Sequence, residues 1–226
     1  MQRTFSLDSL PAVSSPAPER GLAFLGHKCW TGLSVAFLQM AVYLGIGNAE
    51  VARSTDLLRT PLDDALPFLP WTSFAYLPCY VGVFVLALGA MPRRDAFHRT
   101  LLAMVLVGAV AAVAHLLIPA TYPRPVLQAP YADAGEWFMA FVQRIDPPSN
   151  VFPSLHVAHS TALSLILLRE RPRVGRWALL LTAALTLSTL TTKQHFLADL
   201  IAGGALGWAA AKVAMELGRD NPRRRR

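Results

Sequence analysis

Two histidines and an aspartate stand at the start of apolar segments of this chain. His195 and Asp199 begin the last apolar segment. His156 begins an earlier one, directly after Pro153-Ser154-Leu155. Ionisable side chains are costly near lipid, so their presence there indicates a functional site. Imidazole and carboxylate groups in one site are typical of nucleophilic or acid–base catalysis.

His195 and Asp199 are four residues apart, which predicts that they share one face of a helix. A carboxylate one turn from an imidazole can accept its N–H and so fix the tautomer of the ring. The other ring nitrogen then remains available as a nucleophile or a base. The spacing therefore predicts an oriented histidine.

The segment around Ser154 has the features of an anion site. Pro153 favours the first turn of a helix, because its fixed φ suits that position. Ser154 and the free N–H groups of the same turn would bind an anion, assisted by the helix dipole. His156 would lie beside that anion. This arrangement suits a phosphate whose leaving oxygen must be protonated.

Further polar residues could complete such a site. Arg124, in a Pro-Arg-Pro sequence, carries a planar fork that matches phosphate oxygens. Lys193, two residues before His195, could add a second positive charge. Tyr122 and His159 are candidates to line the cavity that would hold the phosphate.

Apolar segments must position these residues. The chain has 226 residues, of which 54% are hydrophobic and 15% charged. The apolar residues form blocks about as long as the roughly 17–25 residues that cross a bilayer. We therefore predict an all-α, polytopic membrane protein. Its six transmembrane helices are expected at about 29–48, 71–91, 99–119, 154–169, 175–192 and 195–217.

The basic residues predict an orientation. Of the 21 Lys and Arg residues, fifteen fall on one side of the six segments and five on the other. The positive-inside rule then predicts that both termini are cytoplasmic. Residues 1–28 would form a flexible cytoplasmic tail, 29–217 the membrane domain and 218–226 a basic cytoplasmic tail. The chemical motifs would all face the extracytoplasmic side.

The outer loop at 120–153 is longer than a simple connection requires. Within it, apolar residues recur at helical spacing over 134–145. This predicts an amphipathic helix that either lies in the membrane interface or forms a lid packed on the bundle.

Three short sequences occur in a fixed order: Pro-Arg-Pro at 123–125, Pro-Ser-Leu-His at 153–156 and His-x-x-x-Asp at 195–199. On six expected spans, this set resembles the type-2 phosphatidic acid phosphatase superfamily of membrane enzymes. It is most similar to the branch that contains inositol phosphorylceramide synthase-like phosphotransferases. The resemblance covers about residues 95–217, which would be the catalytic core.

The resemblance implies a role for each residue. His195 would be the nucleophile that forms a phosphohistidine, and Asp199 would orient it. His156 would be the general acid for the leaving group, while Arg124 and Ser154 would bind phosphate. It further implies a lipid phosphate substrate, no metal or other cofactor, and a multi-pass protein of the cell membrane with its active site on the extracytoplasmic side.

The sequence also departs from the family pattern. Leu117 stands where the family has a lysine, and Ser188-Thr189 replaces a Ser-Arg pair. Leu155 replaces the usual glycine. Two phosphate-binding cations are thus absent from their expected positions, and Lys193 is our candidate to compensate. These departures favour the phosphotransferase branch over a phosphatidate phosphatase.

Other functions fit parts of the same sequence. A metal-dependent membrane hydrolase could bind zinc through side chains of four residues: His156, His159, His195 and Asp199. A non-catalytic lipid-binding protein could keep the same fold. Nucleic-acid binding is disfavoured because the basic residues cluster at segment ends, where anionic lipid explains them. An acyltransferase is disfavoured because its His-to-Asp spacing is one residue longer.

Overall fold

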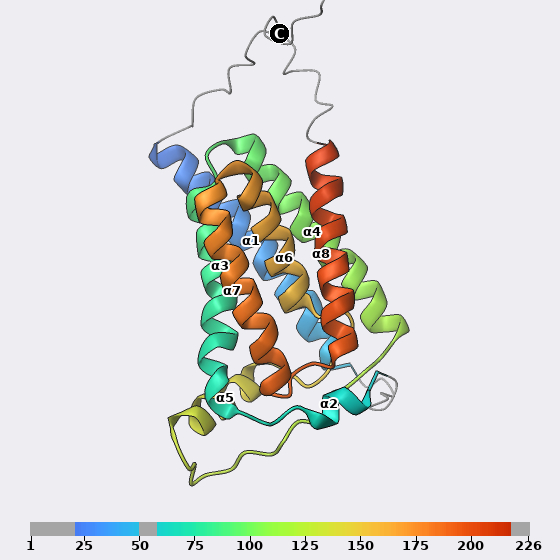
Figure 1. Ribbon diagram of the computed structural model, residues 1–226. Coiled ribbons are helices and arrows are strands. Elements are labelled where there is room, and N and C mark those ends of the chain that lie inside the picture. The colour runs from blue at the N-terminus through green and yellow to red at the C-terminus, as the bar shows by residue number, and fades with distance from the viewer. Residues whose placement is uncertain (1–20, 50–57, 218–226) are drawn as a thin grey trace, which may run out of the picture.

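Six long helices make up most of the molecule and run alternately up and down (Figure 1). The computed structural model describes residues 21–49 and 58–217. The six helices are α1 (Leu22–Gly47), α3 (Ser73–Ala90), α4 (Arg94–Leu117), α6 (Leu155–Glu170), α7 (Pro172–Thr191) and α8 (Leu197–Leu217). The described residues form helices and loops without a β-strand, apart from one isolated bridge between Thr121 and Ser149. The all-α prediction is confirmed.

Five of the predicted spans are helices long and apolar enough to cross a membrane, namely α1, α3, α4, α7 and α8. The sixth, α6, has only 16 residues, which is about 24 Å of helix against about 30 Å of hydrocarbon. It packs against α3, α4, α7 and α8. Because protein surrounds it, α6 can carry buried hydroxyls, such as that of Ser164, which lies 2.9 Å from the Thr182 hydroxyl of α7.

Helix α1 begins seven residues before the segment predicted at 29–48. Residues 22–28, which we assigned to a tail, are therefore helical. The predicted apolar segment begins after Lys28, but the helix includes this charged residue. Lys28 is buried and donates to the carbonyls of Gly89 and Met91 at 3.3 and 3.4 Å. The rest of the N-terminal tail and the basic C-terminal tail lie outside the described residues.

Helices α6 and α8 are in direct backbone contact. A Cβ on Gly207 would lie 2.3 Å from the carbonyl oxygen of Ala158, and one on Gly203 would lie 2.6 Å from that of Ser154. Small residues let two helices approach this closely. The two glycines therefore set the position of the Ser154 region relative to the start of α8.

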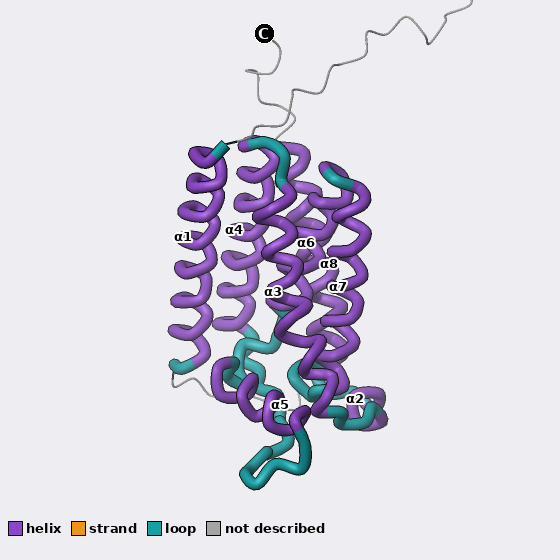
Figure 2. The backbone as a smooth tube through the Cα atoms, turned by 90° about the vertical axis from the view of Figure 1, so that its left-hand side faces the viewer, coloured by secondary structure: helices purple, strands orange, loops and turns teal. Residues whose placement is uncertain are grey.

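Short elements cover the end of the bundle where α6 and α8 begin (Figures 1 and 2): α2 (Pro61–Ala65), the 3-10 turn η2 (Pro70–Thr72) and α5 (Ala134–Ile145). Helix α5 coincides with the helix predicted at 134–145. It packs on α3 and η2 and buries Met139 and Val142, while Trp137 and Phe141 stay exposed. It therefore packs on the bundle as the lid alternative predicts, and its other face carries exposed aromatic residues.

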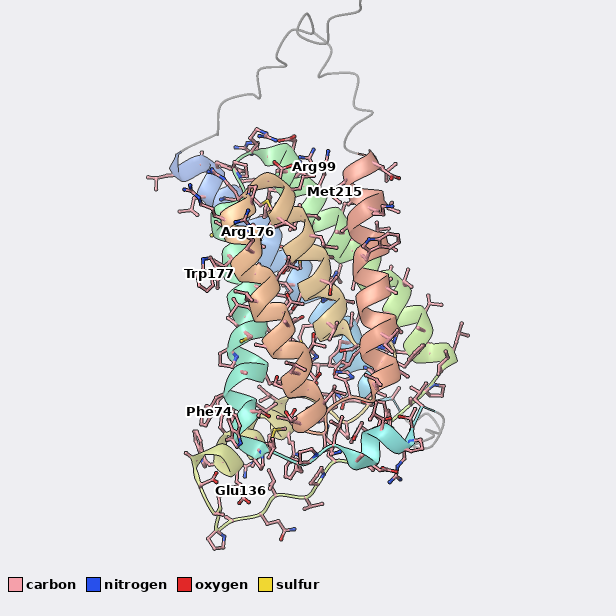
Figure 3. All side chains as sticks on the ribbon, viewed as in Figure 1. Phe74, Arg99, Glu136, Arg176, Trp177 and Met215 are labelled. Atoms are coloured by element: carbon pink, nitrogen blue, oxygen red, sulfur yellow. The ribbon has the colours of Figure 1, made fainter. Side chains whose placement is uncertain are left out.

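The opposite end of the bundle is rich in arginine, and Arg99 and Arg176 lie near it (Figure 3). Arg93 and Arg99 pair with Glu170 at 3.0 and 2.7 Å, which joins the start of α4 to the end of α6. The chemical motifs and the arginine-rich end are thus separated by the length of the bundle.

Candidate active site

The sequence at 153–156 starts α6. Ser154 is the N-cap, fully buried, and its hydroxyl oxygen accepts the backbone N–H of Val157 over 3.5 Å. Pro153 precedes the cap, so the prediction that it occupies the first helical turn is wrong. Serine is a strong N-cap, because its oxygen satisfies a free N–H of that turn. His156 does lie in the first turn, as the spacing predicted.

His195 lies in the turn before α8 and Asp199 in its first turn. The prediction that they share a helical face is therefore wrong, although the side chains meet. Asp199 Oδ2 lies 3.3 Å from His195 Nδ1 and accepts the backbone N–H of Phe196 at 2.8 Å. An acidic residue in the first turn commonly accepts the N–H of the cap, which here holds the turn that carries the histidine.

The two histidines face each other across a short gap. Their ring centroids lie 5.9 Å apart with the planes at 64°. A backbone hydrogen bond of 3.1 Å, from the Ser154 N–H to the Asp199 carbonyl, joins the two motifs. Asp199 is fully buried, and its second carboxylate oxygen, Oδ1, has no hydrogen-bond partner among the described residues. The fold thus holds the His156 and His195 rings next to each other in one site.

Arg124 lies beside a residue that the sequence analysis did not select, Asp146. The guanidinium donates to the backbone carbonyl of Asp146, to that of Pro147 at 3.1 Å and to the Asp146 carboxylate at 3.5 Å. Its Nε is buried, without a partner in the described part of the chain. The arginine is therefore held in place and keeps one unused donor.

Two tyrosine hydroxyls also donate to Asp146. Tyr43 of α1 reaches Oδ1 at 2.7 Å, and Tyr76 of α3 reaches Oδ2 at 2.8 Å. Burial alone would raise the pKa of the Asp146 carboxyl, but His156, Arg124 and the two hydroxyls outweigh it and hold the pKa below its usual range. Asp146 is therefore a largely buried carboxylate whose lowered pKa favours the ionised form at neutral pH.

Tyrosines of α3 surround His156. The Tyr76 hydroxyl lies 3.2 Å from both ring nitrogens, and the Tyr80 ring lies 4.6 Å from the imidazole, centroid to centroid. Neither tyrosine was selected from the sequence, because both lie inside an apolar segment that is typical of a membrane helix. The only feature of the sequence that could have indicated them is the presence of two tyrosine hydroxyls within an apolar segment.

The family model of the PAP2 superfamily matches residues 55–213. The chain belongs to the PAP2 superfamily. Membership confirms the broader part of the sequence-based expectation, a membrane-embedded hydrolase of the lipid phosphatase type. The match is to the superfamily and does not select the inositol phosphorylceramide synthase-like branch.

A solved structure gives a second, weaker comparison. The crystal structure of LpxE from Aquifex aeolicus is similar, with 18% sequence identity and a TM-score of 0.45 over 79% of this chain and 95% of that one. No curated protein matches this chain.

The positions where PAP2 cations are missing have other roles here. Leu117 ends α4 with an exposed side chain. Ser188 and Thr189 are buried in α7, where their hydroxyls donate to carbonyls of their own helix at 2.8 and 2.7 Å. These three residues supply no positive charge to an anion site.

Two of the predicted PAP2 site residues point elsewhere. The Lys193 amine donates to the backbone carbonyl of Asp63 at 2.6 Å. Tyr122 stacks on Phe196, with ring centroids 4.3 Å apart. Burial and the nearby Asp63 carboxylate raise the pKa of Tyr122 to about 12, so its hydroxyl stays neutral. Both residues lie beside the His195 turn, and within the described residues neither forms a hydrogen bond with His156 or Arg124.

An apolar cavity of about 300 Å³ extends from the PAP2 site between α1 and α3. His156 and Asp146 line its polar end, and Phe84 and Leu88 line its apolar part. A second cavity of about 210 Å³ lies between α1 and α4. His159 lines both, with its Nδ1 3.4 Å from the Tyr80 hydroxyl.

The zinc alternative requires ligands that converge. Within residues 21–49 and 58–217, no three His, Cys, Asp or Glu side chains are grouped so that they could hold a metal ion. Asp199 contacts His195 directly, while His156 faces two tyrosine rings. The geometry of these side chains therefore fits an imidazole pair better than a zinc ligand set.

Proposed function

We propose that this protein is an integral membrane enzyme that cleaves or transfers a phosphate ester of a lipid through a phosphohistidine on His195. The observation that carries the proposal is the opposition of the Asp199-bound His195 to His156. Membership of the PAP2 superfamily supports the same reaction class.

The proposed first step forms a nitrogen–phosphorus bond. His195 Nδ1 faces Asp199, so Nε2 is the nitrogen that attacks phosphorus. The bond between phosphorus and the leaving oxygen breaks, and that oxygen takes a proton from His156. Asp199 stabilises the positive charge that develops on the His195 ring.

The proposed second step releases the phosphoryl group. Water or an alcohol attacks the phosphohistidine and gives its proton to His156, while the nitrogen–phosphorus bond breaks. Water yields free phosphate and an alcohol yields a new ester. No metal ion takes part in this scheme. Ser154 and the Nε–H of Arg124 are the proposed donors to the phosphate oxygens.

A lipid substrate is supported by the cavity between α1 and α3. Its wall is largely apolar, and it ends at His156 and Asp146. A chain of about this volume could lie in it while the phosphate reaches the two histidines. The exposed aromatic residues of α5, such as Trp137, would sit at head-group depth.

The finer assignments rest on the sequence. The absence of two family cations favours transfer over simple hydrolysis, as in the inositol phosphorylceramide synthase-like branch. The distribution of basic residues favours an active site on the extracytoplasmic face. Lys193 remains a proposed phosphate ligand only if its side chain leaves the Asp63 carbonyl when substrate binds.

Purified protein incubated with labelled phospholipids, with and without alcohol acceptors and with and without EDTA, tests the proposal. We expect free phosphate or a new phosphodiester, and their ratio assigns hydrolysis or transfer. Failure of every phosphorylated lipid to react would overturn the proposal. Loss of the reaction in EDTA would favour the metal-dependent alternative. A His195→Ala variant with full activity would favour a non-catalytic role for this site.

A further inference from the structure

Asp146 places a negative charge beside the region where the proposed function needs a phosphate. It directly follows α5, and its side chain is only 12% exposed. Two negative groups in one buried site repel each other. A carboxylate at this position therefore opposes phosphate binding. Its presence indicates that it has another role in the site.

The hydroxyl of Tyr76 transmits the effect of Asp146 to His156. A tyrosine hydroxyl has one proton, and a carboxylate can only accept, so the proton lies on the 2.8 Å bond to Asp146. Toward His156 the same oxygen lies 3.2 Å from both ring nitrogens, which places it over the face of the imidazole with its lone pairs toward the ring. A partly negative oxygen over the ring favours the protonated, positively charged imidazole.

Asp146 is the acidic member of the set of groups around His156. Those groups are Tyr76 and Tyr80 of α3, Arg124 and Asp146 of the loops, His159 of α6 and His195 before α8. The N–H groups of an imidazolium lie in the ring plane, so one of them can donate to a leaving oxygen while Tyr76 covers the ring face. Asp146 is placed to stabilise that doubly protonated ring.

We propose that Asp146 is a positioning residue that, through Tyr76, holds His156 as an N–H donor and directly fixes the guanidinium of Arg124. Asp146 and Tyr76 then serve His156 as Asp199 serves His195, so each imidazole has its own carboxylate. The inference rests on the proposed function, because it assigns a partner to the residue that protonates the leaving oxygen.

Two substrates with different leaving groups test this role in the Asp146→Asn variant. An alkyl phosphate of a lipid needs a proton on its leaving oxygen, whereas nitrophenyl phosphate does not. General acid catalysis contributes about 10²–10⁴-fold, so we expect kcat for the lipid to fall about tenfold or more. The kcat for nitrophenyl phosphate should fall much less.

The pH profile gives a second readout that a purely structural role would not change. Without its anionic partner, the protonated His156 releases its proton at lower pH. The basic limb of the kcat profile for the lipid should therefore move to lower pH in Asp146→Asn. Tyr76→Phe should reproduce both effects while leaving the Arg124–Asp146 contacts intact, which separates the relay from the folding cost of a lost ion pair.

Tyr131→Phe is the matched control, since the Tyr131 hydroxyl accepts from Arg144 of α5 at 3.2 Å on the surface; its kinetics should equal those of the wild type. Equal losses for both substrates, or an unchanged basic limb in Asp146→Asn and Tyr76→Phe, would overturn the inference and leave the proposed function standing. A wild-type protein that turns over neither substrate would overturn both.

Discussion

At the scale of single residues, Asp199 has one carboxylate oxygen committed to the protein and one without a partner in the described residues. The committed oxygen holds both the His195 ring and the backbone of the turn. A neutral amide at this position could bond to either group, but it would not stabilise a charged imidazole. The function of Asp199 is therefore electrostatic as well as structural.

We predict that Asp199→Asn lowers kcat for lipid phosphate by about 10²–10⁴-fold, as expected when the acid that orients a catalytic histidine is neutralised. Phosphate release by the purified variant measures this. Asp64→Asn is the control, because Asp64 is exposed and pairs with Arg59 at 2.7 Å. Equal activity of the Asp199 variant and the wild type would contradict the assignment.

Asp146 predicts a pH dependence of stability. Tyr43, Tyr76, Arg124 and His156 face its carboxylate, and together they outweigh burial, so the pKa lies below the ordinary value of about 3.9. Its charge therefore stabilises the fold above about pH 4, and this contribution is lost as the pH falls through the lowered pKa.

Unfolding temperatures of wild type and Asp146→Asn in detergent, measured from neutral to acidic pH, test this dependence. The wild type should be the more stable near pH 7, and the difference should shrink below about pH 4. A difference that stayed constant over the whole range would show that the charge of Asp146 does not contribute.

At the scale of elements, the contact between α6 and α8 positions the two histidine motifs. We predict that Gly207→Ala lowers the free energy of unfolding by about 1–3 kcal/mol, because the new methyl would overlap the carbonyl of Ala158. Gly203→Ala should also lower kcat, because it displaces Ser154 at the start of α6.

Gly204 provides the matched control on the same helix, since a Cβ there meets no atom within 4 Å. Gly204→Ala should leave activity unchanged and stabilise the helix by up to about 1 kcal/mol. Thermal unfolding in detergent compares the three variants. If all three behaved alike, close packing of α6 on α8 would not be what positions the site.

The sequence predicted the helices better than it predicted the hydrogen-bond partners of individual side chains. Helix α5 was predicted at its observed bounds, because its apolar residues recur at helical period. The extension of α1 was missed, because Lys28 finds backbone acceptors on another helix. The role of Asp146 was missed for the same physical reason: Tyr43 and Tyr76 are 103 and 70 residues away in the chain. Such long-range bonds leave no local pattern.

The residue pairs within the site show the same division. The four-residue spacing predicted the contact between His195 and Asp199, although a turn rather than a helical face produces it. The approach of His156 to His195 followed from the alternation of helix directions. The position of Lys193 was not predictable, because the acceptor carbonyl belongs to Asp63 in a short helix far away in sequence.

At the scale of the whole molecule, the histidine motifs lie at the end of the bundle where α6 and α8 begin, and the opposite end is rich in arginine (Figure 3). The positive-inside rule predicts that the arginine-rich end is cytoplasmic. After replacement of both native cysteines, Gln128→Cys should react with a membrane-impermeant maleimide on intact cells, whereas Arg173→Cys should react only after permeabilisation. The reverse pattern of labelling would place the active site on the cytoplasmic side.

The central claim is that His195 attacks phosphorus, and trapping the intermediate tests it most directly. Protein quenched during turnover of a lipid labelled in its phosphate should carry label that is stable in alkali and released by acid, as expected of a phosphohistidine. Peptide mapping should place the label on His195, and His195→Gln should carry none. Turnover by the wild type without any protein-bound label, or label retained by His195→Gln, would contradict this account.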